Sequence, residues 1–321
     1  MATAFLDHPR PLAFAHRGGA AHAPENSMGA FEHAVGLGYR YLETDVQATA
    51  DGVLIAFHDR TLARVTGQPG RIARMAYREL GGVLIDGTEP IPRLEDLLGA
   101  WPDTRFNIDV KDAPAIGPLA GVLRRTNAWD RVCVVSFSNS RLRATRRVLD
   151  RPVCMAAPPL GAAMVRFGGA RGRHDTRGPD RTSGTLRLRR KPWRTAGPGR
   201  AGLLSAGASP VEVTSAAGGP AVGTPAAAFP AAGPPPAYSP RLLAEWVDRT
   251  GVMCLQVPHP VVTPSLIDRA HTLGLQLHAW TVNDRPTMER MLDLGVDGIM
   301  TDETVALREV LASRGQWHPA G

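Results

Sequence analysis

Short runs rich in Val, Ile and Leu alternate with amphipathic, helix-like segments along most of this chain. Eight runs are expected to form parallel strands, at residues 12–16, 41–46, 105–111, 131–137, 152–157, 253–258, 275–282 and 298–301. Helices are expected between and after them, at residues 27–36, 94–100, 115–124, 140–149, 241–249, 264–273, 285–294 and 305–313. Eight strands that alternate with helices predict an α/β fold, the closed (β/α)₈ TIM barrel. The 321 residues are enough for one such barrel.

One further strand-like run does not fit this alternation. Residues 53–58 follow the second strand after only residues 47–52. A crossover between parallel strands needs about a dozen residues or more, so this run cannot be the next barrel strand. We therefore expect an extra antiparallel strand over the mouth of the barrel, turned by Asp51 and Gly52.

Residues 166–237 interrupt the pattern between the fifth and sixth strands. An Arg-rich stretch is followed by one rich in Gly, Ala, Pro and Ser, and neither has an apolar period. One interpretation is a long irregular or disordered insertion in a single barrel domain that covers residues 10–312. Another is translation of part of this segment out of frame from GC-rich DNA. A barrel that lacks its usual helix here could also be catalytically impaired.

The formal charge of +7 is confined to this same segment. Residues 166–209 hold ten Arg and one Lys against two Asp, a net charge of +9, so the rest of the chain carries −2. No recognisable nucleic-acid-binding module surrounds the basic stretch, and we expect no nucleic-acid partner. The three cysteines lie in apolar runs and are expected to be small buried side chains in a reducing compartment.

The sequence predicts a cytoplasmic protein without stable membrane insertion. Its first residues lack a basic segment followed by a long apolar one, and no window reaches the roughly 18 apolar residues of a membrane span. The sequence leaves the oligomeric state open.

Two carboxylates, Glu43 and Asp45, lie two positions apart on the second strand. Side chains at that spacing share one face, which at the end of a barrel strand is the mouth. Two anions this close repel unless a cation lies between them. Hard oxygen ligands indicate a divalent metal, Mg²⁺ or Ca²⁺, rather than zinc. The alternative is one surface carboxylate and one that a helix N-terminus stabilises.

Further polar residues end neighbouring strands. His16 and Arg17 end the first strand, Asp109 and Lys111 share a face of the third, and His58 ends the extra strand. Together they would supply an acid/base pair, cations that hold a phosphate, and a metal site, which suits phosphodiester cleavage. The other histidines that we considered are expected to be structural or on the surface: His8, His22, His33, His174, His259, His271 and His278.

These residues belong to a longer ordered set of motifs: AFAHRGGAAHAPENSMGAF, YLETDVQATADGVLIAFHDRTLARVTG, FNIDVK, VVSFS, HAWTVND and GVDGIMTDE. In this order the chain resembles the glycerophosphodiester phosphodiesterases, within the wider phosphatidylinositol-phospholipase-C-like barrels, over residues 10–160 and 250–312. The resemblance implies a TIM barrel, a Mg²⁺ or Ca²⁺ ion, and hydrolysis of small glycerophosphodiesters to glycerol 3-phosphate and an alcohol in lipid and glycerol metabolism. A related phospholipase-type phosphodiesterase with another substrate is the alternative.

The resemblance also implies residue roles. It makes three carboxylates the metal ligands, Glu43, Asp45 and Asp109, and two histidines the acid/base pair, His16 and His58. Arg17 and Lys111 would bind the phosphate, and Trp280 would form a wall of the substrate pocket. A core aromatic remains the alternative for Trp280. We favour His16 as the base and His58 as the acid.

Two details of the motifs add expectations. The family most often has Glu where this chain has Asp109, so the third metal bond is expected to be weaker or water-mediated. In the PENS motif, Asn26 and Ser27 are expected to cap the following helix, and Glu25 to support the site.

Overall fold

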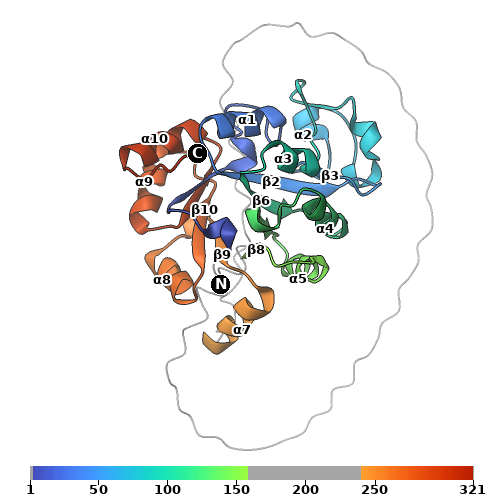
Figure 1. Cartoon of the computed structure of the whole chain (residues 1–321). Coiled ribbons are helices and arrows are strands. Elements are labelled where there is room, and N and C mark those ends of the chain that lie inside the picture. The colour runs from blue at the N-terminus through green and yellow to red at the C-terminus, as the bar shows by residue number, and fades with distance from the viewer. Residues whose placement is uncertain (1–2, 158–239, 321) are drawn as a thin grey trace, which may run out of the picture. The chain divides into compact units, whose positions relative to one another are not determined.

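The computed structural model describes residues 3–157 and 240–320, so the segment at residues 166–237, with its two interpretations, lies outside the described residues. Eight parallel strands close into a barrel because β1 pairs with both β2 and β11 (Figure 1). The predicted TIM barrel is therefore confirmed. Its strands are β1 (Leu12–Ala15), β2 (Tyr41–Ala48), β6 (Arg105–Val110), β7 (Val132–Val135), β8 (Cys154–Ala157), β9 (Cys254–Pro258), β10 (Gln276–Trp280) and β11 (Gly298–Thr301).

Helices surround the barrel on its outside (Figure 1). They are α1 (Met28–Gly36), α3 (Leu94–Ala100), α4 (Ile116–Arg125), α5 (Asn139–Val148), α7 (Pro240–Thr250), α8 (Pro264–Thr272), α9 (Arg285–Leu294) and α10 (Thr304–Ser313). Short polar side chains begin several of them. The Ser27 hydroxyl accepts a hydrogen bond from the Ala30 backbone N–H, and Asp284 does the same for Thr287.

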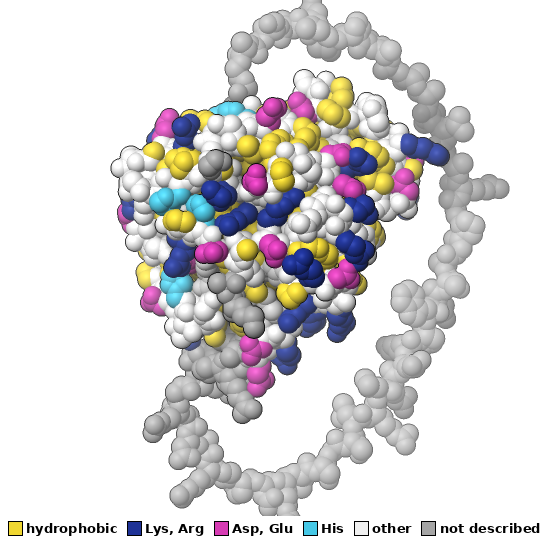
Figure 2. Space-filling model, in the orientation of Figure 1, with side chains coloured by type: hydrophobic (Ala, Val, Ile, Leu, Met, Phe, Trp, Pro, Cys, Tyr) yellow, Lys and Arg dark blue, Asp and Glu magenta, His cyan; other side chains and the backbone are white. Residues whose placement is uncertain are grey.

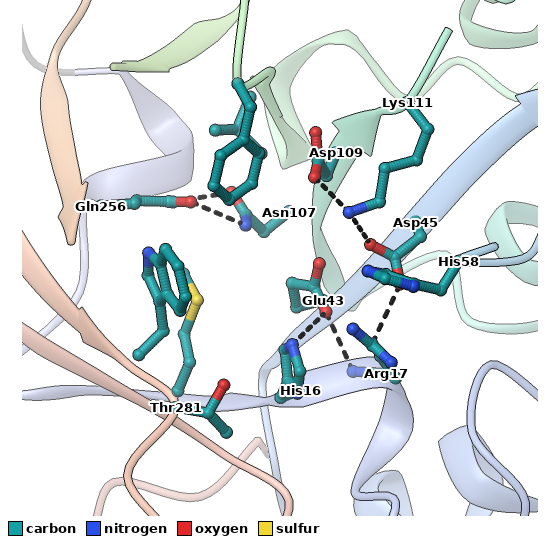
Figure 3. Close-up of a pocket in the computed structure, with 14 residues that line it drawn as sticks. His16, Arg17, Glu43, Asp45, His58, Asn107, Asp109, Lys111, Gln256 and Thr281 are labelled. Carbon is teal, nitrogen blue, oxygen red and sulfur yellow. Dashed lines mark hydrogen bonds and ion pairs between the residues drawn. The ribbon is translucent and has the colours of Figure 1, made fainter. Parts of the chain in front are cut away.

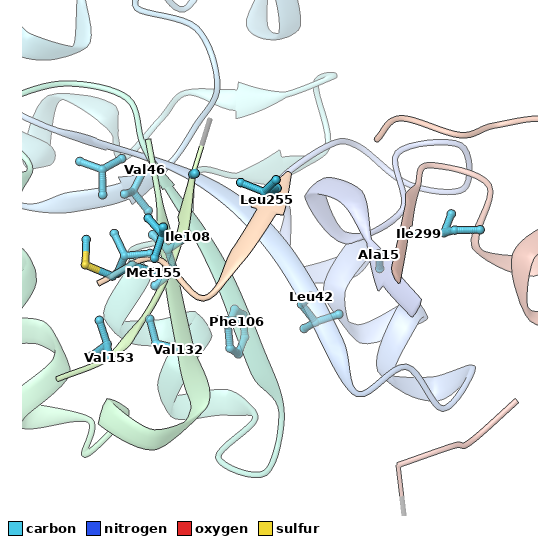
Figure 4. Close-up of a cluster of buried hydrophobic side chains, with 14 of the residues drawn as sticks. Ala15, Leu42, Val46, Phe106, Ile108, Val132, Val153, Met155, Leu255 and Ile299 are labelled. Carbon is cyan, nitrogen blue, oxygen red and sulfur yellow. The ribbon is translucent and has the colours of Figure 1, made fainter. Parts of the chain in front are cut away.

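Alternation along each strand separates the core from the site. On β2, the outward side chains of Leu42 and Val46 belong to the main hydrophobic core between the strands and the helices. Figure 4 shows this layer, to which Phe106, Ile108 and Ile299 contribute from other strands. The inward positions of β2 are therefore left for residues of the barrel interior.

The barrel interior is filled by a separate hydrophobic cluster that includes Phe5, Phe14 and Tyr41. The hydroxyl of Tyr41 donates to the Phe5 carbonyl oxygen at 2.8 Å, which fixes the N-terminal segment against the barrel. All three cysteines belong to this cluster and are buried and unbridged, as expected. Their sulfur atoms, on β7, β8 and β9, lie within 4.8 Å of one another.

The extra strand is also confirmed. β3 (Leu54–Ala56) pairs antiparallel with β2 and leads into an excursion, residues 54–92, before α3. The excursion contains the short helix α2 (Ala63–Thr66) and a hairpin of β4 (Leu84–Ile85) and β5 (Glu89–Pro90), and it has its own hydrophobic cluster. We did not predict the hairpin, because two-residue strands are too short to show a period.

Two observations relate to the expectations of no nucleic-acid partner and no stable membrane insertion. Figure 2 shows Lys and Arg side chains interspersed with Asp and Glu across the face that it presents. Within residues 3–157 and 240–320, no helix combines the length and the apolar character needed to cross a bilayer.

His278, on β10, gives a test of the barrel interior. The side chain is fully buried, and burial lowers its pKa from 6.5 to about 4. The folded state therefore resists protonation, while the unfolded state takes up a proton as the pH falls below the ordinary value. The neutral His278 therefore contributes fully to the stability of the fold above its unfolded-state pKa of 6.5. This contribution is lost as the pH falls toward its folded-state pKa of about 4.

We expect His278→Gln to remove this pH dependence. Between about pH 7 and pH 5, the wild-type free energy of unfolding should fall by about 2 kcal/mol more than that of the variant. Urea unfolding followed by circular dichroism at both pH values measures the difference. Equal losses in the two proteins would show that His278 does not titrate in this way.

Candidate active site

All eight residues predicted from the sequence line one pocket at the carboxyl ends of the strands (Figure 3). They are His16, Arg17, Glu43, Asp45, His58, Asp109, Lys111 and Trp280. Segments as distant in the sequence as β1 and β10 supply them, because parallel barrel strands all end at the same rim. Asn107, Phe137 and Gln256 also line the pocket, and we did not predict them.

Both carboxylates of β2 are buried. Glu43 is 5% exposed and Asp45 is 2% exposed, so the alternative with one surface carboxylate is wrong. Asp45 is held by two cations: the Lys111 ammonium lies 2.7 Å from one oxygen, and Arg17 Nε lies 3.1 Å from the other. Burial alone would raise the pKa of Asp45, but Lys111 and Arg17 outweigh it and hold the pKa well below its usual value.

The backbone at Arg17 turns sharply to reach the β2 carboxylates. Arg17 has a φ of 51°, in the left-handed region that few residues adopt without strain. This turn lets its backbone N–H donate to Glu43 Oε2 at 3.0 Å. A Cβ atom at the next residue, Gly18, would lie 2.8 Å from the Ala30 Cβ, so the turn also requires glycine there.

Two buried carboxylates remain poorly neutralised. Burial and the neighbouring charge of Asp45 raise the pKa of Glu43 to about 7. Burial also raises the pKa of Asp109, whose Oδ2 accepts from Lys111 at 2.7 Å while its buried Oδ1 has no partner among the described residues. Carboxylate oxygens are the donors that a hard divalent cation prefers. The chemistry of these residues therefore fits Mg²⁺ or Ca²⁺.

The spacing of the acids is wider than in a closed metal site. In the described part of the chain, only the three cysteines bring three possible metal ligands within 4.8 Å of one another. The ammonium of Lys111 lies between Asp45 and Asp109, 2.7 Å from an oxygen of each. Lys111 thus already supplies part of the positive charge that we expected from a metal alone.

Each pocket histidine has a carboxylate on its Nδ1 atom. His16 Nδ1 lies 2.7 Å from Asp302 Oδ1, and His58 Nδ1 lies 2.6 Å from Asp59 Oδ1. Such a contact orients the ring and leaves Nε2 to exchange protons. His16 Nε2 lies 3.8 Å from Glu43 Oε2, on the pocket side.

The surroundings shift the two histidines in opposite directions. Burial alone would lower the pKa of His16, but Glu43 and Asp302 outweigh it and raise the pKa above its ordinary value. Burial lowers the pKa of His58; the charge of Asp45 opposes this shift, while Lys111 and Arg17 add to it. Which of the two histidines acts first as the base stays a prediction from the sequence.

The PENS motif supports the site more than we expected. Ser27 caps α1, but Asn26 does not: its amide donates to Asp45 Oδ2 at 3.1 Å, and its oxygen accepts from the Thr44 hydroxyl at 2.8 Å. Glu25 accepts from Arg17 Nη1 at 3.1 Å, which agrees with its expected supporting role. Asn26 therefore connects the first loop to the end of β2, while Glu25 holds Arg17 within that loop.

Three pocket residues that we did not predict, Asn107, Gln256 and Phe137, take part in two contacts across the pocket. Asn107 and Gln256 exchange hydrogen bonds of 3.1 and 2.9 Å across the barrel. Phe137 is 48% exposed, and its ring meets that of Trp280 edge to face at 5.7 Å. Asn107 lies two positions before Asp109, so the strand period could have placed it on the pocket face.

The arrangement combines three chemical capacities in one pocket. The two oriented histidines can exchange protons, Arg17 and Lys111 can bind an anion, and the buried acids can bind a hard cation. Attack on a phosphodiester can use all three, since the substrate is anionic and its leaving alcohol must gain a proton.

Comparison with known sequences agrees with this chemistry. The sequence model of the glycerophosphoryl diester phosphodiesterase family matches residues 16–154 and 227–306. A relative from Mycobacterium tuberculosis, named "Probable glycerophosphodiester phosphodiesterase 2", is 35% identical over 322 residues, which cover 98% of this chain and 96% of the relative. A glycerophosphodiester phosphodiesterase from Caldanaerobacter subterraneus is 24% identical over 95% of this chain and 100% of the relative.

Solved structures share the fold. A glycerophosphodiester phosphodiesterase from Agrobacterium tumefaciens superposes with a TM-score of 0.64 at 17% identity, covering 94% of this chain and 100% of the other. A phosphodiesterase from Oleispira antarctica, solved with the product sn-glycerol-3-phosphate, gives a TM-score of 0.64 at 17% identity over 94% of this chain and 97% of the other. From the match to the family over most of its length, the chain belongs to the glycerophosphoryl diester phosphodiesterase family and is a phosphoric diester hydrolase.

Proposed function

We propose that this protein hydrolyses small glycerophosphodiesters to sn-glycerol 3-phosphate and an alcohol in a reaction that depends on a divalent cation. One observation carries the proposal: two carboxylate-oriented histidines share a pocket with buried acids and two cations. The product named for the Oleispira antarctica phosphodiesterase, a protein of the same fold, supports the same product here.

The cation would be held by Glu43, Asp45 and Asp109. Two of these carboxylates have raised pKa values, and Asp109 Oδ1 lacks a partner among the described residues. A cation would therefore offset the cost of burying their negative charge. When bound, it would supply positive charge to the phosphate oxygens. Lys111 would share this role, because its ammonium already lies against Asp45 and Asp109.

The chain's own residues would carry the proton transfers and hold the phosphate. Arg17 and Lys111 would hold the phosphate oxygens, where negative charge grows during the reaction. One of the two pocket histidines, His16 or His58, would take the proton of the glycerol 2-hydroxyl, whose oxygen attacks phosphorus. The other would give a proton to the departing alcohol. Water would then open the resulting cyclic phosphate, with the two histidines in exchanged roles.

The aromatic pair would form the opposite wall. Trp280 lines the pocket, and the exposed ring of Phe137 stands against it. A flat apolar wall suits the carbon chain of glycerol and leaves the hydroxyl groups free to face the polar side. We therefore propose Trp280 as a substrate-contacting residue.

A substrate series tests this function. Glycerophosphocholine should release sn-glycerol 3-phosphate and choline, detected by a coupled dehydrogenase assay and by mass spectrometry. An analogue in which propane-1,3-diol replaces glycerol lacks the 2-hydroxyl and should be cleaved at least about a hundredfold more slowly, since attack from within the substrate is lost.

Other outcomes would change the assignment. Release of choline from lysophosphatidylcholine, with no product from glycerophosphocholine, would favour the phospholipase-type alternative. Equal cleavage of the propanediol analogue would exclude attack by the 2-hydroxyl and would require direct attack by water.

A further inference from the structure

Arg64 lies on α2, in the excursion of residues 54–92, and is not among the residues that line the pocket. Its guanidinium donates hydrogen bonds to two carboxylates, those of Glu25 and Asp59. Nη1 and Nη2 lie 2.9 and 2.5 Å from the two oxygens of Glu25, and Nε lies 2.5 Å from Asp59 Oδ2. A planar guanidinium can make this double contact because its donors are fixed in a fork.

Each of these two carboxylates also contacts a residue of the pocket. Glu25 Oε1 and Oε2 both lie 3.1 Å from Arg17 Nη1, and Asp59 Oδ1 lies 2.6 Å from His58 Nδ1. A continuous series of contacts therefore runs from His58 through Asp59, Arg64 and Glu25 to Arg17. The series joins the excursion to the loop that follows β1, which are far apart in the sequence.

Arg64 is the member of this series that touches neither end. Its side chain is 44% exposed, so its two contacts add little to the overall stability of the fold. The carboxylates are more enclosed, with 14% exposure for the Glu25 side chain and 25% for Asp59. Removing Arg64 would leave each of them with one side-chain partner, His58 for Asp59 and Arg17 for Glu25, and with freedom to rotate away from it.

We propose that Arg64 is a positioning residue that sets the His58 ring and the Arg17 guanidinium together, through Asp59 and Glu25. The inference rests on the proposed function, in which His58 transfers a proton and Arg17 holds the phosphate. A misplacement of about 1 Å at such groups can lower a rate about a hundredfold. Arg64 therefore acts on turnover through one carboxylate and on phosphate binding through the other.

The effect through Asp59 on turnover and the effect through Glu25 on phosphate binding can be measured separately. Asp59→Asn should lower kcat for glycerophosphocholine about tenfold or more, with the Kd of sn-glycerol 3-phosphate nearly unchanged. Glu25→Gln should weaken that Kd by a similar factor. Arg64→Ala should do both, and combining it with Asp59→Asn should add no further loss in kcat. Calorimetric titration of the metal-loaded protein gives the Kd without relying on turnover.

Two further variants separate positioning from general damage. Arg74→Ala removes an exposed arginine of the same excursion that makes no ion pair with the described residues, and it should leave both quantities unchanged. Arg64→Lys keeps the charge without the fork and should recover only part of each loss. Thermal melts should show Arg64→Ala folded like the wild type.

The inference is overturned if Arg64→Ala keeps kcat and Kd within about twofold of the wild type, or if its losses add fully to those of Asp59→Asn and Glu25→Gln. These results are distinguishable from failure of the proposed function. If His58→Ala loses activity while Arg64→Ala does not, only the positioning role fails. If His58→Ala remains active, the proposed function fails as well.

Discussion

Replacing His16 or His58 with alanine lowers the turnover of glycerophosphocholine by at least about a hundredfold and leaves the fold intact. The two histidines line the pocket, and each is oriented through Nδ1 by a carboxylate, Asp302 or Asp59. Loss of either ring leaves one proton transfer without a side chain to carry it. Initial rates of sn-glycerol 3-phosphate release, together with circular dichroism melts, measure both parts of the prediction.

His22→Ala is the matched control for these variants. His22 lies near the same rim, on the loop after β1, but does not line the pocket. Its replacement should leave the rate within about twofold of the wild type. Near-wild-type turnover in either His16→Ala or His58→Ala would remove that residue from the acid/base pair.

Chelation of divalent cations should lower the same rate by about a thousandfold, and Mg²⁺ or Ca²⁺ added in excess of the chelator should restore it. Without a cation, the pocket presents buried carboxylates to an anionic substrate, and the raised pKa values of Glu43 and Asp109 reflect that unrelieved charge. The restored rate as a function of each cation's concentration would also show which ion the site prefers.

A comparison with His16→Ala makes the chelation result specific. His16→Ala should stay inactive whether or not a cation is added, since its defect is in proton transfer. Unchanged wild-type turnover in excess chelator would mean that Lys111 and Arg17 alone neutralise the acids and the phosphate.

Local rules were enough to predict the polar residues of single strands. Glu43 and Asp45 share a face because a strand repeats every two residues, and the same rule joins Asp109 to Lys111. The eightfold alternation of strands and helices then brought these strand ends to one rim. The extra strand followed from loop length, because six residues cannot make a parallel crossover.

The contacts that support the pocket could not be predicted in this way. Asp302 reaches His16 only because β11 closes the barrel against β1, and nothing near either residue in the sequence encodes that contact. Asn26 follows the rules for a helix cap, yet its side chain binds Asp45 instead. The place of Lys111 between two acids depends on side-chain packing, which strand periodicity does not specify.

Titration of Mg²⁺ and Ca²⁺ into the chelator-treated protein, followed by calorimetry, tests most directly whether the acids of the pocket hold a cation. The account predicts about one ion per chain in the wild type and loss of that binding in Asp45→Asn. The wild-type Asp45 carboxylate lies among Arg17, Lys111 and Asn26, at the centre of the acidic site. Absence of binding in the wild type, or equal binding in Asp45→Asn, would contradict it.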